Sequence, residues 1–195
     1  MWRLARIIMG PAYRAIFRFR VTGKKNIPRT GGVILCANHT SYHDTLVLGI
    51  SSPRDINFLA KKELFEKKLV SRVLLRLKAI PVDRDKPSMD IMKKVLKLLK
   101  DEEAVGIFMQ GGRRKDGDAD DYKAGVALFA IKGKVPVVPI NISSDFRFRS
   151  KVHINIGSPI SFKEYHGKKV RTEELNTIAQ RIMDEIVNLG NYTQK

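Results

Sequence analysis

The chain has 195 residues, which suits a single domain that can bury its own hydrophobic core. Its 37 lysines and arginines outnumber 20 acidic residues and give a net charge of +17, which indicates an anionic partner such as a lipid surface, a nucleic acid or an acidic protein. The single cysteine, Cys36, excludes an internal disulfide framework, and no run approaches the ~20 apolar residues that a membrane-spanning helix needs.

The first twenty residues mix arginines with bulky apolar side chains. No acidic residue precedes Asp44, whereas eight basic residues do. Pro11 is expected to kink this helical segment or to split it in two. A basic amphipathic helix is typical of a membrane interface, and a helix packed on the domain's own core is the open alternative. We therefore divide the chain into a membrane-association segment, residues 1–20, and a folded domain, residues 21–195.

Short apolar runs alternate with helical patterns through the rest of the chain. Strands are expected at residues 32–37, 56–60, 79–82, 104–109, 135–140 and 152–156. Helices are expected at residues 62–77, 88–101, 122–133 and 172–189. This alternation predicts an α/β fold with a mostly parallel central sheet flanked by helices, preceded by an N-terminal amphipathic membrane-interface helix.

The segment CANHTSYHDTLVLG, residues 36–49, gathers the side chains that can carry chemistry. His39 and His43 have the i, i+4 spacing of a zinc site, but Thr40 stands where such sites carry a glutamate, so no metal is expected. Ser41 is not in a G-x-S-x-G elbow, and Cys36 ends a strand that is expected to be buried, which disfavours both as nucleophiles.

The remaining candidate is a pair formed by His39 and Asp44. On a regular helix these residues would point about 140° apart, at ~100° per residue. They can meet only if His39 stands in the turn before a helix that begins near Tyr42, with Ser41 or Thr40 as its cap. Asp44 would then orient the imidazole, and His39 would be a general base for a hydroxyl group that the substrate brings.

Four blocks of sequence, in order between residues 21 and 160, resemble those of the glycerolipid acyltransferase family of the bacterial 1-acyl-sn-glycerol-3-phosphate type. NHTSYHD, residues 38–44, resembles the N-H-x4-D motif that opens the series. AKKELF and AIPVDR are similar to the second block, and IFMQGGRRKDG to the third, usually written F-P-E-G-T-R-S. YKAGVALFA and VPVVPI are similar to the fourth.

The resemblance implies transfer of an acyl group from acyl carrier protein or coenzyme A to the sn-2 hydroxyl of 1-acyl-glycerol-3-phosphate, forming phosphatidate without a cofactor or metal. His39 would be the base and Asp44 its partner, and backbone N–H groups at the helix start would stabilise the oxyanion. The substrate phosphate would be held by Lys61, Arg113 and Arg84. The supporting residues would be Asn38, Gln110, Gly111 and Gly112. The enzyme would lie on an anionic surface, the cytoplasmic face of the bacterial cell membrane, as a monotopic or peripheral protein.

Departures from the family pattern leave two further hypotheses open. Gln110 and Gly112 replace the usual Glu and Thr of the third block, which leaves a different lysophospholipid acceptor possible. Lys78 stands where Gly is frequent, so the local turn is expected to differ. From another class, the net charge alone would suit a non-catalytic basic protein that binds membrane or nucleic acid. The chain carries no nucleic-acid-binding signature, so nucleic acid is not expected as a partner.

Overall fold

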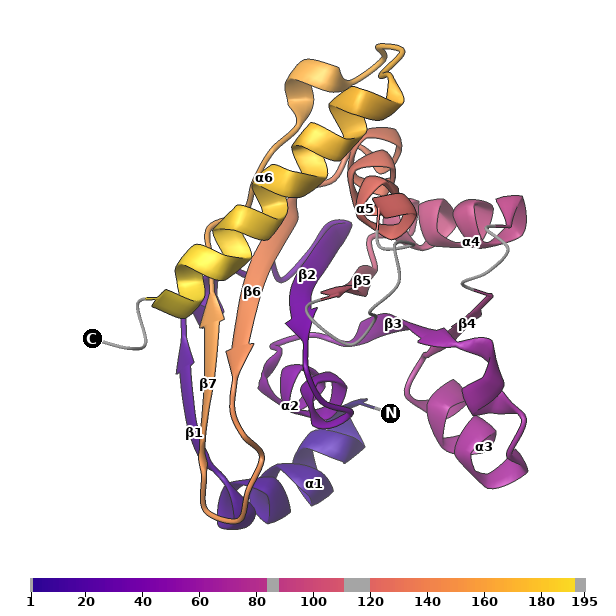
Figure 1. The fold of residues 1–195 in the computed structure, drawn as a ribbon. Coiled ribbons are helices and arrows are strands. Elements are labelled where there is room, and N and C mark those ends of the chain that lie inside the picture. Colours follow the sequence, from indigo (N-terminus) through magenta and orange to yellow (C-terminus); the bar gives the residue numbers. More distant parts are fainter. Residues whose placement is uncertain (1, 84–87, 111–119, 192–195) are drawn as a thin grey trace.

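The computed structural model describes residues 2–83, 88–110 and 120–191, and these ranges form one twisted sheet with helices on both faces (Figure 1). Within them, seven strands lie in the order β1-β7-β6-β2-β5-β3-β4. Neighbouring strands are parallel except β6 and β7, which are antiparallel. The strands are β1 Arg18–Thr22, β2 Val33–His39, β3 Ile56–Lys61, β4 Ile80–Val82, β5 Ala104–Gln110, β6 Val137–Ser143 and β7 Lys151–Ile156. The predicted α/β class with a mostly parallel sheet is confirmed.

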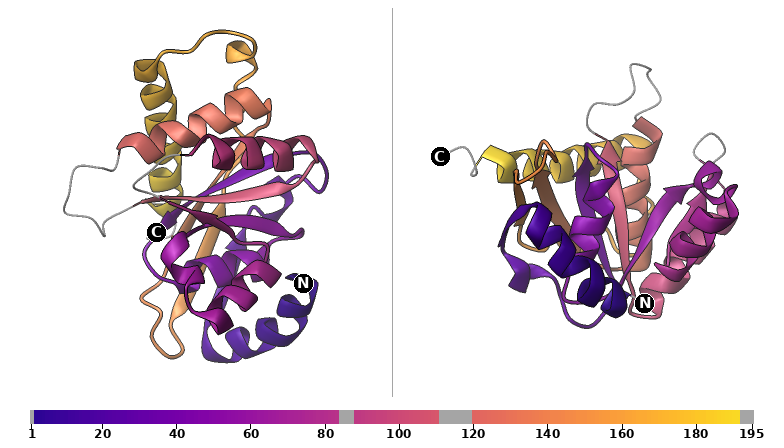
Figure 2. Two further views of the ribbon diagram at one scale, coloured as in Figure 1. Left: turned by 90° about the vertical axis from the view of Figure 1, so that its right-hand side faces the viewer. Right: turned by 90° about the horizontal axis from the view of Figure 1, so that it is seen from below.

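The two faces of the sheet carry different helices (Figures 1 and 2). Ile34 and Cys36 of the central strand β2 pack with α4, α5 and α6, whereas Leu35 and Ala37 pack with α1 and α2. This alternation follows from the two-residue period of a strand, because successive side chains point to opposite faces. The helices are α1 Trp2–Ile16, α2 His43–Ser51, α3 Lys68–Arg76, α4 Met89–Lys100, α5 Asp120–Gly133 and α6 Thr172–Asn191, with short 3-10 turns η1 Lys24–Asn26, η2 Lys62–Phe65 and η3 Lys163–Tyr165.

Three local features differ from the prediction. Pro11 does not end α1, which continues to Ile16; Pro11 is exposed, so water can satisfy the carbonyl that loses its helical partner. The helix expected at residues 62–77 is divided into η2 and α3. Residues 18–22 form the edge strand β1, which the sequence analysis did not expect.

Helix α1 packs on α2 through one face. The indole Nε1 of Trp2 donates a hydrogen bond to the carbonyl of Ile56 at 2.8 Å, and its ring meets Phe58 edge-on. The guanidinium of Arg6 donates to the carbonyl of Gly49 and pairs with Asp55. The opposite face of α1 leaves apolar side chains exposed, namely Leu4, Ile7 and Ile8. None of the helices in the described ranges is long and apolar enough to cross a membrane.

Candidate active site

The pair predicted from angular spacing is assembled at the carboxyl end of β2. His39 is the last residue of that strand, and α2 begins at His43, so His39 precedes the helix that carries Asp44. The imidazole Nδ1 of His39 lies 3.1 Å from Oδ2 of Asp44. The Asp44 side chain is fully buried, and the His39 side chain is 25% exposed. The base would therefore be reachable while its partner is shielded.

Asp44 is fixed by the backbone of the turn that it follows. The N–H groups of Thr40 and Ser41 each donate to its Oδ2 at 2.7 Å. Because a carboxylate only accepts hydrogen bonds, the proton of a neutral imidazole must lie on Nδ1 of His39. The other ring nitrogen, Nε2, is then the one that can accept a proton. Oδ1 of Asp44 is buried without a hydrogen-bond partner among the described residues.

The N–H groups at the start of α2 are mostly engaged within the turn. Those of Thr40 and Ser41 serve Asp44, the N–H of Asp44 donates to the carbonyl of Ser41, and the N–H of His43 donates to Oγ of Ser41 at 3.3 Å. The N-cap of α2 is Tyr42, whose side chain makes no capping hydrogen bond, so the prediction of Ser41 or Thr40 as the cap is wrong. Ser41 stands one residue earlier and only its Oγ reaches the N–H of His43. Each of these four N–H groups would have to give up its present hydrogen bond to act as one of the oxyanion donors that were expected at the helix start.

Asn38 ties the end of β2 to the neighbouring strand. Its amide Nδ2 donates to the carbonyl of Ile142 at 2.8 Å, and the N–H of Ile142 donates back to its Oδ1 at 2.7 Å. The regular β2–β6 ladder stops at Ala37, which pairs with Ile140. The side chain of Asn38 thus continues the hydrogen bonding between β2 and β6 one residue beyond the last backbone pair, immediately before His39. This contact gives its predicted supporting position a physical basis.

Three adjacent parallel strands end side by side near His39. Gln110, the last residue of β5, is its direct register partner. Lys61 ends β3 on the other side of β5; its Nζ lies 3.6 Å from Oε1 of Glu63, and its side chain is half exposed. The structure therefore places Lys61 and the start of the third block at the edge that holds His39. The predicted residues Arg84, Gly111, Gly112 and Arg113 lie outside the described residues.

Aromatic side chains surround both histidines of the motif. The His39 ring lies 4.6 Å from the ring of Phe108, measured between centroids, and Phe108 stacks on Phe58. His43 bonds through Nδ1 to the hydroxyl of Tyr13 at 3.0 Å and stacks on Phe146. His43 therefore joins α2 to α1. The sequence analysis missed this role, since Tyr13 and Phe146 come from distant parts of the chain.

The remaining candidates of the motif region have structural roles. Cys36 is fully buried in the sheet, and burial raises the pKa of its thiol, so the reactive thiolate is disfavoured. No three metal-ligating side chains gather in the part of the chain that the structure describes.

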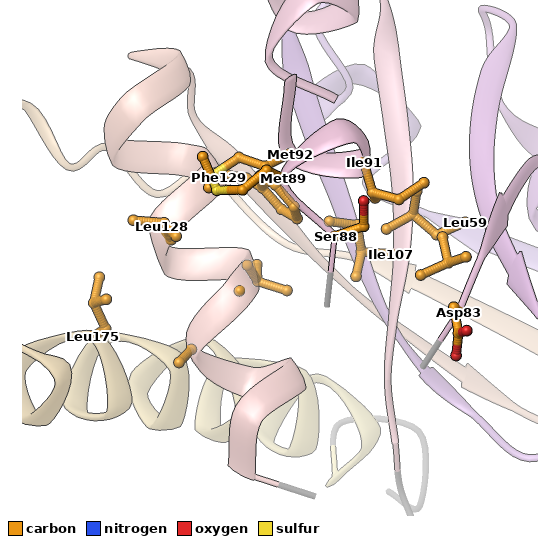
Figure 3. Close-up of a pocket in the computed structure, with 14 residues that line it drawn as sticks. Leu59, Asp83, Ser88, Met89, Ile91, Met92, Ile107, Leu128, Phe129 and Leu175 are labelled. Carbon is orange, nitrogen blue, oxygen red and sulfur yellow. The ribbon is translucent and has the colours of Figure 1, made fainter. Parts of the chain in front are cut away.

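An apolar cavity of about 280 Å³ lies on the other face of the sheet, between the strands and helices α4 and α5 (Figure 3). Ile107 of β5 lines it, whereas the next residue, Phe108, points to the opposite face and meets His39. The cavity is therefore separated from the imidazole by the sheet. Its other labelled walls in Figure 3 are Leu59, Asp83, Ser88, Met89, Ile91, Met92, Leu128, Phe129 and Leu175.

Comparison with known proteins defines the class. The family model described as Acyltransferase matches residues 18–143. The 1-acyl-sn-glycerol-3-phosphate acyltransferase of Bacillus subtilis is 33% identical over 178 residues, which cover 88% of each chain. The chain therefore belongs to the acyltransferase family, as the four blocks indicated.

Two further proteins resemble the chain, one by sequence and one by fold. The protein of the same name from Streptococcus pneumoniae is 30% identical over 83% of this chain, which spans 62% of that relative. The crystal structure of the 1-acyl-sn-glycerophosphate (LPA) acyltransferase PlsC from Thermotoga maritima shares the fold, with a TM-score of 0.73 and 22% identity, over all of this chain and 80% of the other.

Proposed function

We propose that the protein transfers an acyl group from an acyl thioester to the sn-2 hydroxyl of 1-acyl-glycerol-3-phosphate, forming phosphatidate. The observation that carries the proposal is the His39–Asp44 pair, held at 3.1 Å inside the motif that opens the family's series of blocks. The relatives from Bacillus subtilis and Streptococcus pneumoniae carry the name of this activity.

In the proposed reaction, Nε2 of His39 accepts the proton of the acceptor hydroxyl as its oxygen attacks the thioester carbonyl. The buried carboxylate of Asp44 stabilises the imidazolium that forms. The tetrahedral intermediate collapses, the carbon–sulfur bond breaks, and the imidazolium returns the proton to the leaving thiolate. The acyl group stays on the acceptor oxygen as an ester, the carrier (acyl carrier protein or coenzyme A) is released as a free thiol, and the reaction consumes no cofactor.

The position of Lys61 supports an anionic acceptor. Lys61 is the last residue of β3, which pairs in parallel with β5, and β5 pairs in parallel with β2, so Lys61 and His39 lie toward the same end of the sheet. Leu59, two residues earlier in β3, faces the cavity on the other side of the sheet, so the Lys61 ammonium would meet the phosphate of an acceptor bound at His39 by reaching around the end of the sheet. Arg113 and Arg84, which follow β5 and β4 in the chain, are proposed to complete this phosphate site.

The exposed face of α1 supports association with a membrane. Leu4, Ile7 and Ile8 are between 52% and 63% exposed, while the inner face of the same helix is held by Trp2 and Arg6. Exposed Arg3 and Arg14 accompany this apolar face. An apolar face accompanied by arginines suits the interface of an anionic bilayer. The exposed face of α1 supports a monotopic or peripheral position on the membrane, and we propose that this is the cytoplasmic face.

A donor-by-acceptor activity matrix with mass spectrometry of the products tests the proposal. We expect phosphatidate from lysophosphatidate with at least one of acyl carrier protein and coenzyme A as donor carrier. A preference for another lysophospholipid would support the alternative motivated by Gln110 and Gly112. Vesicle or oligonucleotide binding without turnover on any acceptor would instead support a non-catalytic basic binding protein.

A further inference from the structure

Helix α3 exposes an apolar strip that no other part of the described chain covers (Figure 1). Leu69 is 77% exposed, Val73 is 53% exposed and Val70 is 40% exposed. At ~100° per residue these three side chains lie within an arc of about 100° on one side of the helix. Large apolar side chains that cluster on a surface mark a contact with another apolar phase. We refer to Leu69, Val70 and Val73 as the α3 strip.

A row of basic side chains lies next to the α3 strip. Lys68, Arg72 and Arg76 follow one another at four-residue intervals, all are exposed, and the helix contains no acidic residue. Lys67, directly before the helix, adds a fourth positive charge. Long basic side chains beside an apolar strip can reach anionic head groups while the strip enters the interface.

The chain connections place α3 at the catalytic end of the sheet. The connection between β3 and β4 leaves β3 after Lys61 and returns at Ile80, which pairs with Leu59 near the end of β3. Because β2, β5 and β3 are parallel, this is the same end of the sheet at which β2 finishes in His39. In Figure 1, α1 and α3 both lie at the lower end of the molecule, beyond the arrowhead of β2.

We propose that α3 is a second membrane-contact element, in which the strip enters the interface of an anionic phospholipid bilayer and the basic row binds lipid phosphates. Together with the exposed face of α1, it would orient the catalytic edge of the sheet toward the lipid that supplies the acceptor. This inference rests on the proposed function. An acidic carrier protein could also bind the basic row, but it would leave the strip in water, so the exposed apolar side chains favour a bilayer.

Flotation with phosphatidylglycerol–phosphatidylcholine vesicles tests the inference on the full chain. Arg72→Gln with Arg76→Gln should lower the partition coefficient roughly 30-fold. Leu69→Ser with Val73→Ser should lower it about tenfold, because two apolar side chains no longer leave water. Lys168→Gln with Lys169→Gln and Val187→Ser, which alter exposed residues remote from α3, are the matched controls and should bind as the unmodified protein does.

Activity assays separate the possible outcomes. On a short-chain lysophosphatidate dissolved as monomers, the α3 variants should keep their turnover rate; on vesicle-embedded acceptor they should lose it. Unchanged vesicle partition would overturn the inference. If the only effect of the α3 variants is a higher KM for acyl carrier protein, the inference is also overturned, and α3 is instead a binding surface for the carrier protein. If the unmodified protein acylates lysophosphatidate neither as monomers nor in vesicles, the proposed function fails, while the partition data still decide whether α3 binds membranes.

Discussion

The indole of Trp2 lies directly on Gly49. A methyl group placed on Gly49 would come within 1.9 Å of Cζ3 of Trp2, so only glycine at this position of α2 lets the first residue of α1 reach its buried site. Trp2 is also the only tryptophan of the chain. Its fluorescence therefore reports whether α1 is docked on the domain.

Gly49→Ala should displace the indole. We expect the free energy of unfolding to fall by about 1–3 kcal/mol, as for other overpacked sites, and the emission of Trp2 to shift to longer wavelength. Gly10→Ala in α1 is the matched control, because its new methyl group would lie at an ordinary 3.6 Å from Cγ2 of Ile50. Equal emission spectra for the two variants would show that this contact does not hold α1.

Asp44→Asn should separate the structural role of Asp44 from its charge. The amide oxygen can still accept hydrogen bonds from Thr40 and Ser41, so the fold should survive. The neutral amide stabilises an imidazolium less, so kcat should fall by roughly 10²-fold or more. Asp44→Ala should in addition lower the free energy of unfolding by about 1–3 kcal/mol, because the N–H groups of Thr40 and Ser41 lose their acceptor. Chemical denaturation and steady-state kinetics measure the two effects, and full activity of the asparagine variant would contradict the role of Asp44.

Asn38→Leu should loosen the end of β2. Both hydrogen bonds to Ile142 are lost and the backbone groups of Ile142 remain partly buried, so we expect a loss of about 2 kcal/mol in stability. Because His39 is the next residue, turnover should fall as well. Asn141→Leu is a suitable comparison, since Asn141 is the neighbouring residue of β6 but its Nδ2 donates to the carbonyl of Ile186 in α6, on the face of the sheet opposite His39. If both variants lose stability equally and only Asn38→Leu loses turnover, the positioning role is supported; equal turnover in both would rule it out.

His153 should make the fold sensitive to acid. Burial, together with the positive charges of Arg20 and Lys151, lowers the pKa of His153 from its usual 6.5. The unfolded chain therefore binds a proton at a higher pH than the folded chain does, so stability is fully present above pH 6.5 and decreases as the pH falls toward the lowered value. His153→Gln should flatten this part of the stability profile, measured by denaturation between pH 5 and 7.5 (roughly the window around the usual histidine pKa). An unchanged profile for His153→Gln would contradict the prediction.

The sequence predicted the fold and the candidate site best where one strand or helix contains both an apolar pattern and the candidate catalytic side chains. The apolar run ending at Ala37 predicted a strand, which the structure places at the centre of the sheet. The angular offset between His39 and Asp44 required the turn that the structure contains. The mostly parallel sheet followed from alternating strands and helices, because parallel strands need long crossovers.

Features that depend on distant partners were not accessible in this way. β1 is a short edge strand whose exposed Arg18 and Arg20 continue the basic pattern of α1, so no change of composition marks where the helix stops. The contacts of Trp2 with Ile56 and of His43 with Tyr13 span 54 and 30 residues and leave no local periodicity.

At Lys78 the backbone adopts the left-handed conformation, with φ of 59°, so the turn has the geometry that glycine favours although the side chain is lysine.

The central claim is that His39 is the base for acyl transfer, and the most direct measurement compares His39→Ala with His166→Ala in the phosphatidate-forming assay. The His39 variant should lose roughly 10²–10⁴-fold in kcat while its unfolding transition stays close to that of the unmodified protein. The His166 variant should keep its turnover, since His166 lies after η3 and outside the motif. Full turnover by a folded His39→Ala protein would contradict the account.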